Sequence, residues 1–243
     1  MTVSEFKNEF LIHYNAIATN SAPSLDDYEI SVYLTKAQLE LVKTYSNPEG
    51  NKYKEGFEAS EKRRVDLKEL TKHYVATAYS GEPEGISTDS KFIKIPDDVF
   101  LIRYESIEVI SADCNNGIVI SVYPKTLDEY NIQKDNPFKR PSNKIAWRLD
   151  YSMIDTDKVV EIITPYEISK YNLRYTRYPN PIILSDLTIF AEGLSIDGFT
   201  ASQTSELSAE IHREILDRAV ELALRDYKPS GLESKIQLDS RNE

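Results

Sequence analysis

The stretch Ser80-Gly-Glu-Pro-Glu-Gly-Ile-Ser-Thr-Asp-Ser-Lys-Phe-Ile-Lys-Ile95 marks a change in the spacing of apolar residues along the chain. Upstream of it, apolar side chains recur every three or four residues, which is the spacing of amphipathic helices. Its first six residues include two glycines and a proline, a composition typical of a linker. Downstream, short runs rich in Val, Ile and Tyr are separated by turn residues, which indicates strands.

Three helices are expected before this stretch. The first two place apolar residues on one face, namely Phe6, Phe10, Tyr14 and Ile17, then Ile30, Leu34, Ala37 and Leu41. Asp26 or Asp27 is suited to cap the second helix. The third helix is expected from near Glu58 to Thr77. Its inward residues would be Leu67, Leu70 and Tyr74, and its outward residues Lys62, Arg63 and Arg64.

Six strand-like runs follow, and they predict an antiparallel sheet of about five or six strands. They cover residues 92–95, 100–110, 117–123, 144–149, 159–163 and 170–178. The segment 124–143 is longer and more polar than the other connections. It predicts a short helix over 126–130 and then an exposed loop over 134–143. Such excursions from a sheet often serve as interaction arms.

The last helix has the clearest pattern in the chain. Thr204 or Ser205 is a candidate N-cap, and Pro229 and Gly231 predict an end near Tyr227. The apolar stripe is Ile211, Ile215, Ala219 and Leu222. Two i, i+4 ion pairs are expected on its polar face, Glu214 with Arg218 and Glu221 with Arg225.

These elements predict an α+β fold in which an antiparallel β module is inserted into a helical bundle. The bundle would consist of three N-terminal helices and the C-terminal helix. The expected boundaries are 1–80 for the first helices, 81–200 for the β module, 201–228 for the last helix and 229–243 for an extended docking tail.

Composition excludes several functional classes. The 243 residues carry a formal charge of −11, which argues against a protein that grips nucleic acid with most of its surface. Only eight glycines occur, and no glycine-rich phosphate loop is present, so common nucleotide enzymes are not expected. No apolar stretch could span a bilayer, and the start lacks the pattern of a secretory signal. The single cysteine, Cys114, can form no intrachain disulfide.

Few residues suggest chemistry. The histidines His13, His73 and His212 lack the clustered partners of a zinc site, and Cys114 has no neighbouring base. We therefore expect no catalytic residue, metal or cofactor. The paired carboxylates Asp26-Asp27 and Asp97-Asp98 fit a helix cap and a turn better than a shared acid–base or cation site.

Two sets of residues are better candidates for binding. The basic residues Lys62, Arg63 and Arg64, together with Lys68 and Lys72, could meet phosphate, meet an acidic neighbouring subunit, or form a solvated helix face. Lys134, Lys139 and Arg140 in the long loop leave the same alternatives open. A second set, the tyrosines 166, 171, 175 and 178, could form a stacking platform or simply cover the sheet.

Several motifs together resemble a known family. They are Leu34-Thr-Lys-Ala-Gln38, Phe57-Glu-Ala-Ser-Glu-Lys-Arg-Arg64, Ile95-Pro-Asp97, Arg177-Tyr-Pro-Asn-Pro-Ile-Ile-Leu184 and Glu210-Ile-His-Arg-Glu-Ile-Leu-Asp-Arg-Ala-Val-Glu-Leu-Ala223. In this order the chain resembles the head–tail connector, adaptor or ring proteins of crAss-like short-tailed bacteriophages. None of the motifs encodes chemistry, and together they span most of the chain.

The resemblance implies a non-enzymatic virion protein that forms a ring, usually twelve-fold, beneath the portal and around the DNA channel. The implied partners are neighbouring copies, the portal, downstream ring or tail proteins, and genomic DNA that passes without sequence-specific binding. No membrane partner is implied, and the protein would be made in the host cytoplasm. The implied interface residues are Lys62, Arg63, Arg64, Lys139, Arg140, Tyr171, Tyr175, Leu232, Ile236 and Leu238.

Other functions stay open on the sequence. The chain could form a ring further down the tail, where it would attach tail or fibre components. A carbohydrate-binding module would need exposed, coplanar tyrosines, and a small acidic enzyme would need carboxylates or histidines that converge in one pocket.

Overall fold

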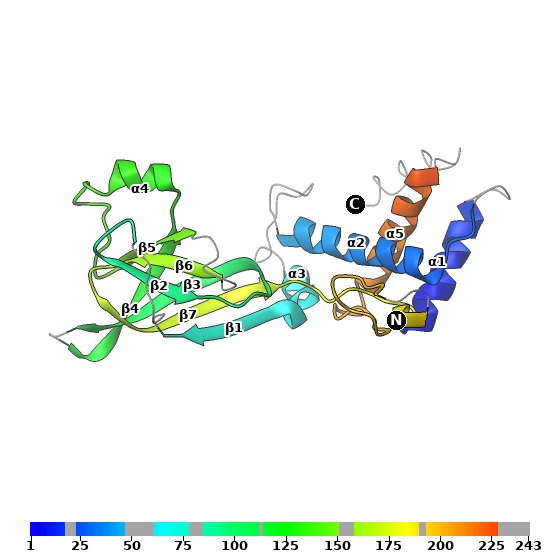
Figure 1. The fold of residues 1–243 in the computed structure, drawn as a ribbon, viewed down its shortest axis with the longest axis horizontal. Coiled ribbons are helices and arrows are strands. Elements are labelled where there is room, and N and C mark those ends of the chain that lie inside the picture. Colours follow the sequence, from blue (N-terminus) through cyan, green and yellow to red (C-terminus); the bar gives the residue numbers. More distant parts are fainter. Residues whose placement is uncertain are drawn as a thin grey trace. The chain divides into compact units, whose positions relative to one another are not determined.

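The computed structural model describes residues 1–17, 23–46, 61–77, 85–111, 114–150, 158–189 and 193–227. The chain forms two compact units (Figure 1). The helical unit consists of residues 1–70 and 179–243, and the β unit consists of residues 71–178. The sequence placed these boundaries near 80 and 200. They differ because the third predicted helix ends early and because the chain beyond Tyr178 packs with the helices.

Three long helices build the helical unit: α1 (Val3–Ile17), α2 (Asp27–Ser46) and α5 (His212–Tyr227). The predicted apolar faces are confirmed. Phe6 and Phe10 of α1, Leu34 of α2 and Ile215 of α5 are fully buried. Because α1 and α2 both pack on α5, the last helix completes the core of this unit. Two short 3-10 helices, η2 (Lys68–Leu70) and η3 (Leu187–Ile189), belong to the same unit.

The third predicted helix is mostly wrong. Residues 58–60 lie outside the described part of the chain; in the rest of the predicted range α3 (Glu61–Asp66) is α-helical, η2 follows it, and Thr71–Ala76 forms the strand β1. In this strand Tyr74 packs against the core of the β unit, whereas His73 and Val75 are exposed. That alternation has the period of a strand. The three residues expected on the inward face of one helix therefore lie in different elements. Leu67 follows α3, Leu70 ends η2, and Tyr74 belongs to β1.

The start and the ion pairs of the last helix also differ from the prediction. The helix begins at His212, because the hydroxyl of Ser205 instead donates to Gln38 Oε1 at 2.6 Å and accepts from the Leu207 amide. The predicted pairs do not form. Arg218 contacts Glu40 and Glu221, each at 2.7 Å. Both partners hold the guanidinium between α2 and α5.

The β unit is one curled sheet of seven strands in the order β1-β7-β3-β4-β5-β6-β2. After β1 the strands are β2 (Ser90–Lys94), β3 (Val99–Ser111), β4 (Cys114–Pro124), β5 (Ile145–Asp150), β6 (Val159–Ile163) and β7 (Glu167–Arg177). All six predicted strands are confirmed. The expectation of a wholly antiparallel sheet is wrong, because β4 and β5 are parallel. The excursion between them lets the chain re-enter in the same direction, as parallel pairing requires.

The excursion contains α4 (Leu127–Gln133), close to the predicted short helix. Thr126 caps it, and Thr126 and Glu129 form a reciprocal capping box. Buried Tyr130 of α4 meets Trp147 of β5 edge-on, with 6.1 Å between the ring centroids. This contact anchors the excursion to one face of the sheet. The other face carries the main apolar core, which includes Ile107, Ile162 and Leu173.

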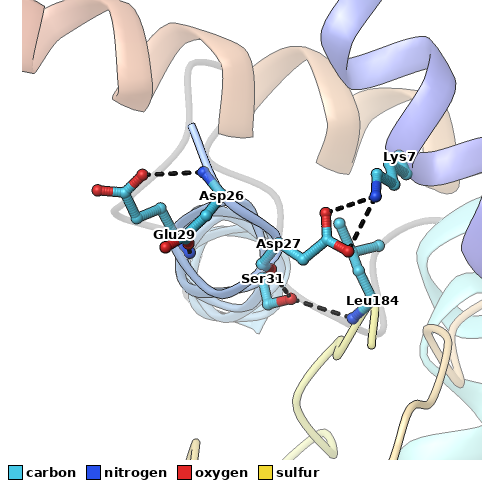
Figure 2. A network of polar contacts seen from close by, with 6 residues as sticks. All are labelled: Lys7, Asp26, Asp27, Glu29, Ser31 and Leu184. Atoms are coloured by element: carbon cyan, nitrogen blue, oxygen red, sulfur yellow. Dashed lines mark hydrogen bonds and ion pairs between the residues drawn. The ribbon is translucent and has the colours of Figure 1, made fainter. Parts of the chain in front are cut away.

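A polar network joins α1, α2 and the segment that returns from the β unit (Figure 2). Asp26 caps α2 as predicted, since its carboxylate accepts from the Glu29 amide at 2.8 Å. Asp27 instead pairs with Lys7 of α1 at 2.7 Å. The Ser31 hydroxyl donates to the Asp27 carbonyl and accepts from the Leu184 amide at 3.0 Å. The network therefore fixes both α1 and residue 184 to the first turns of α2.

Gln38 continues this attachment further along α2. Its side chain is fully buried, donates to the Asn180 carbonyl at 2.7 Å and accepts from the Ser205 hydroxyl at 2.6 Å. Between Ser31 and Gln38, the Thr35 hydroxyl accepts from the Ile182 amide at 3.1 Å. The three polar side chains thus satisfy backbone groups that would otherwise be buried without partners.

Gln38→Ala is expected to destabilise the chain by about 2–4 kcal/mol, because it removes buried volume and two hydrogen bonds, to the Asn180 carbonyl and the Ser205 hydroxyl. The free energy of unfolding from urea titration measures this loss. Lys36→Ala, on an exposed position of the same helix, is the control and is expected to change the value by less than about 0.5 kcal/mol. A loss equal to that of the control would contradict the role given to Gln38.

Candidate functional site

The basic residues of α3 do not form a common exposed face. Arg63, predicted to point outward, is buried, and its guanidinium lies 5.4 Å from the ring centroid of Tyr45. Lys62 pairs with Glu214 of α5 at 3.1 Å. Lys62 and Arg64 are both exposed. Arg63 and Lys62 therefore make contacts inside the helical unit. A cation beside an aromatic face, as at Arg63, is stabilising.

Asp66 lies next to these residues and is fully buried. Within the described part of the chain, neither of its carboxylate oxygens has a hydrogen-bond partner. Burial raises the pKa of Asp66, and the nearby carboxylates of Glu214 and Glu210 raise it further, while Lys62 acts in the opposite direction. The charged form of this side chain is thus disfavoured in the folded chain.

Because the folded state has the higher pKa, it holds the Asp66 proton more tightly than the unfolded state does. This contribution to stability is present below the ordinary aspartate pKa and is lost as the pH rises through the raised value. Asp66→Asn is therefore expected to be more stable than the wild type at pH 7, with a smaller difference at pH 5. Urea unfolding at both pH values tests this, with Glu69→Gln as an exposed control. A less stable variant at pH 7 would refute it.

The tyrosines proposed as an interface lie in the interior of the β unit. Tyr171 is fully buried, and its hydroxyl donates to Glu105, whose other carboxylate oxygen meets Arg148 Nη1 at 2.5 Å. Burial and the Glu105 charge raise the pKa of Tyr171. Tyr175 is 5% exposed and donates to Asp98 at 3.0 Å. Both rings therefore cover the sheet, which is the second of the two alternatives that the sequence left open for these tyrosines.

The contacts of Glu105 predict unequal losses on mutation. Tyr171→Phe is expected to cost about 1–2 kcal/mol, because one hydrogen bond is lost and Arg148 still neutralises Glu105. Arg148→Met is expected to cost about 3–5 kcal/mol, because it leaves a buried carboxylate without its counter-charge. Urea unfolding of both variants measures the order, and equal losses would contradict it.

Lys139 and Arg140 lie in an exposed segment that we call the arm, residues 125–144. The arm also carries three exposed apolar residues, of which Ile132 is 79% and Phe138 is 94% exposed; Leu127 is the third. The arm and its charges could be predicted from the sequence, but the exposure of these apolar residues was not predicted. The available signal was the presence of a phenylalanine and an isoleucine in a polar segment rich in turn residues.

The backbone of the arm is held by its own hydrogen bonds. Asn136 Oδ1 accepts from the Phe138 amide at 3.0 Å, and the Asn136 carbonyl accepts from the Arg140 amide at 3.0 Å. At the far end, the Ser142 amide donates to the Ile145 carbonyl at 2.8 Å. The arm therefore presents Phe138 on a defined turn. Figure 1 shows α4 as part of this excursion from the sheet.

Several of the remaining candidates fall outside the part of the chain that the structure describes. Leu232, Ile236 and Leu238, and the side chain of Cys114, lie outside the described residues. His212 is buried between the N-terminal amine at 2.7 Å and the Leu207 carbonyl at 3.0 Å, and burial lowers its pKa. Over the described ranges, His, Cys, Asp and Glu form no group suited to hold a metal. In those ranges no helix combines the length and the apolar character needed to cross a membrane.

Comparison with known proteins identifies the class. Residues 1–233 match the family model for phage tail ring protein 3/4. The chain is 38% identical to ring protein 4/5 of Bacteroides phage crAss001 over all of both chains. It is 37% identical to ring protein 3 of the same phage, over 92% of this chain and 95% of the relative. The chain belongs to the phage tail ring protein 3/4 family, which confirms the resemblance to ring proteins of crAss-like phages. It is a structural ring component of a phage tail.

Proposed function

We propose that copies of this chain form a closed, twelve-fold ring in the neck of the virion, without enzymatic activity. The ring joins the portal to the tail and surrounds the channel through which the genome passes. The observation that carries the proposal is the match to a ring-protein family over residues 1–233. The order of helical and β elements, which the spacing of apolar residues predicted, is compatible with the plan that the resemblance implies.

A ring built from one chain needs head-to-tail contacts, in which each copy presents one surface and receives another. The two units of this chain supply chemically different surfaces for that purpose. The helical unit, residues 1–70 and 179–243, carries 15 basic and 24 acidic residues, a net charge of −9. The β unit carries 14 basic and 16 acidic residues, a net charge of −2.

The acidity of the chain supports passage of DNA rather than binding. Each copy contributes −11, so a ring of many copies would repel the phosphate backbone at short range. Genomic DNA is then a partner in transit, with no sequence-specific contact. Made in the host cytoplasm, the protein would end in the neck or tail of the virion, in contact with neighbouring copies, the portal and downstream ring proteins.

A ring further down the tail is the second candidate. The identities to ring protein 3 and to ring protein 4/5 of one phage, 37% and 38%, are nearly equal. Similarity therefore favours neither of the two relatives' positions over the other. Binding to the portal separates this candidate from the first.

Native mass spectrometry of the purified chain, alone and mixed with the portal protein of the same phage, tests both candidates. A closed twelve-fold species that binds the portal, or a monomer that assembles only on it, is expected for the neck ring. A closed ring that ignores the portal would move the protein further down the tail. A monomer or dimer under every condition would refute the ring itself.

A further inference from the structure

We propose that the arm, residues 125–144, is the projecting half of the subunit contact and docks on the acidic helical unit of the neighbouring copy. This inference rests on the proposed ring, because it names the surfaces through which the copies meet. Its occupant is a second copy of this chain.

The arm exposes apolar residues that its own folding does not need. Tyr130 is the buried residue of α4, and it anchors the arm through Trp147. Ile132 and Phe138 do not serve this anchor, since they are 79% and 94% exposed. Exposed aromatic and aliphatic residues gathered on one projection are typical of interface anchors.

Hydrogen bonds within the arm already hold it in one conformation. The turn around Asn136 is closed by hydrogen bonds to the Phe138 and Arg140 amides, and Ser142 is tied to Ile145. A segment that is ordered before binding loses less conformational entropy on docking than a free loop does. More of the free energy gained by burying Phe138 is therefore available for association.

Charge selects the receiving surface. The arm carries five basic and three acidic side chains, a net charge of +2 in a chain of −11, and its part 134–144 carries +3. The helical unit carries −9, whereas the β unit carries −2. A basic projection meets its complementary potential on the helical unit of the next copy, and this also orients the two copies head to tail.

Ile132→Ser with Phe138→Ser tests the apolar anchors. The control is Ile110→Ser, which removes a 67%-exposed isoleucine from β3 of the same unit. Mass photometry over a range of concentrations gives the subunit concentration at which half of the chain is in rings. We expect the double variant to raise that concentration by at least about tenfold and the control to leave it within about twofold. Circular dichroism shows whether both variants fold.

Charge reversal tests the electrostatic part. Lys139→Glu with Arg140→Glu is compared with Lys72→Glu with Arg174→Glu, which makes the same charge change at exposed positions of β1 and β7. We expect the arm variant alone to weaken assembly, with a smaller difference from the wild type in 0.5 M salt than in 0.1 M salt, because screening removes the attraction. Equal effects of both variants would overturn the charge argument.

Cross-linking identifies the receiving surface. Rings assembled from equal amounts of ¹⁴N- and ¹⁵N-labelled chain are treated with a zero-length amine–carboxyl reagent. Mixed-isotope links from Lys134 or Lys139 to carboxylates of residues 1–70 or 179–243 support the proposal. Links to the β unit, or links only within one copy, overturn it. If the wild type forms no ring, the proposed function fails, whereas an intact ring of the arm variant overturns this inference alone.

Discussion

Three polar side chains on one face of α2 hold the structure of the helical unit together. Ser31, Thr35 and Gln38 bind the backbone at residues 184, 182 and 180 in turn. Their spacing of four and three residues keeps them on the same side of the helix. The bonded segment is the one that returns from the sheet, so these contacts set the point at which the β unit ends and the helical unit resumes.

The apolar core of the helical unit follows from that attachment. Once residues 180–184 are bound along α2, Ile182 and Ile183 are buried. The chain then reaches Ser205, which also bonds Gln38, before α5 packs on α1 and α2. The helical unit, assembled from two distant parts of the chain, thus uses hydrogen bonds to position the second part and apolar burial to stabilise it.

Patterns that depend on local spacing could be predicted from the sequence. The faces of α1 and α2, the cap at Asp26 and the six strands were all correct because each follows from neighbouring residues. The errors arose where distant residues decide. Thr71–Ala76 is a strand because β7 pairs with it. Arg218 binds Glu40 of α2 instead of Glu214 on its own helix. Likewise the burial of Tyr171 depends on Glu105 and Arg148, which lie on other strands. The arm could be located in the sequence from its polarity. The exposure of Ile132 and Phe138 could not be predicted, because it depends on which residue of the arm packs on the sheet, and that residue is Tyr130.

The insertion of the β unit between α2 and α5 has a consequence for how each copy is made. During synthesis, α1 and α2 leave the ribosome well before α5, because the whole of residues 71–178 lies between them. Until α5 appears, the apolar faces around Phe10 and Leu34 lack the helix against which both α1 and α2 mainly pack. The sheet is a contiguous stretch of chain and can form in the meantime, although its parallel β4–β5 pair requires the intervening excursion to close first. A truncated chain is therefore left with an exposed apolar surface, and only a finished chain has a closed helical unit to present to its neighbours.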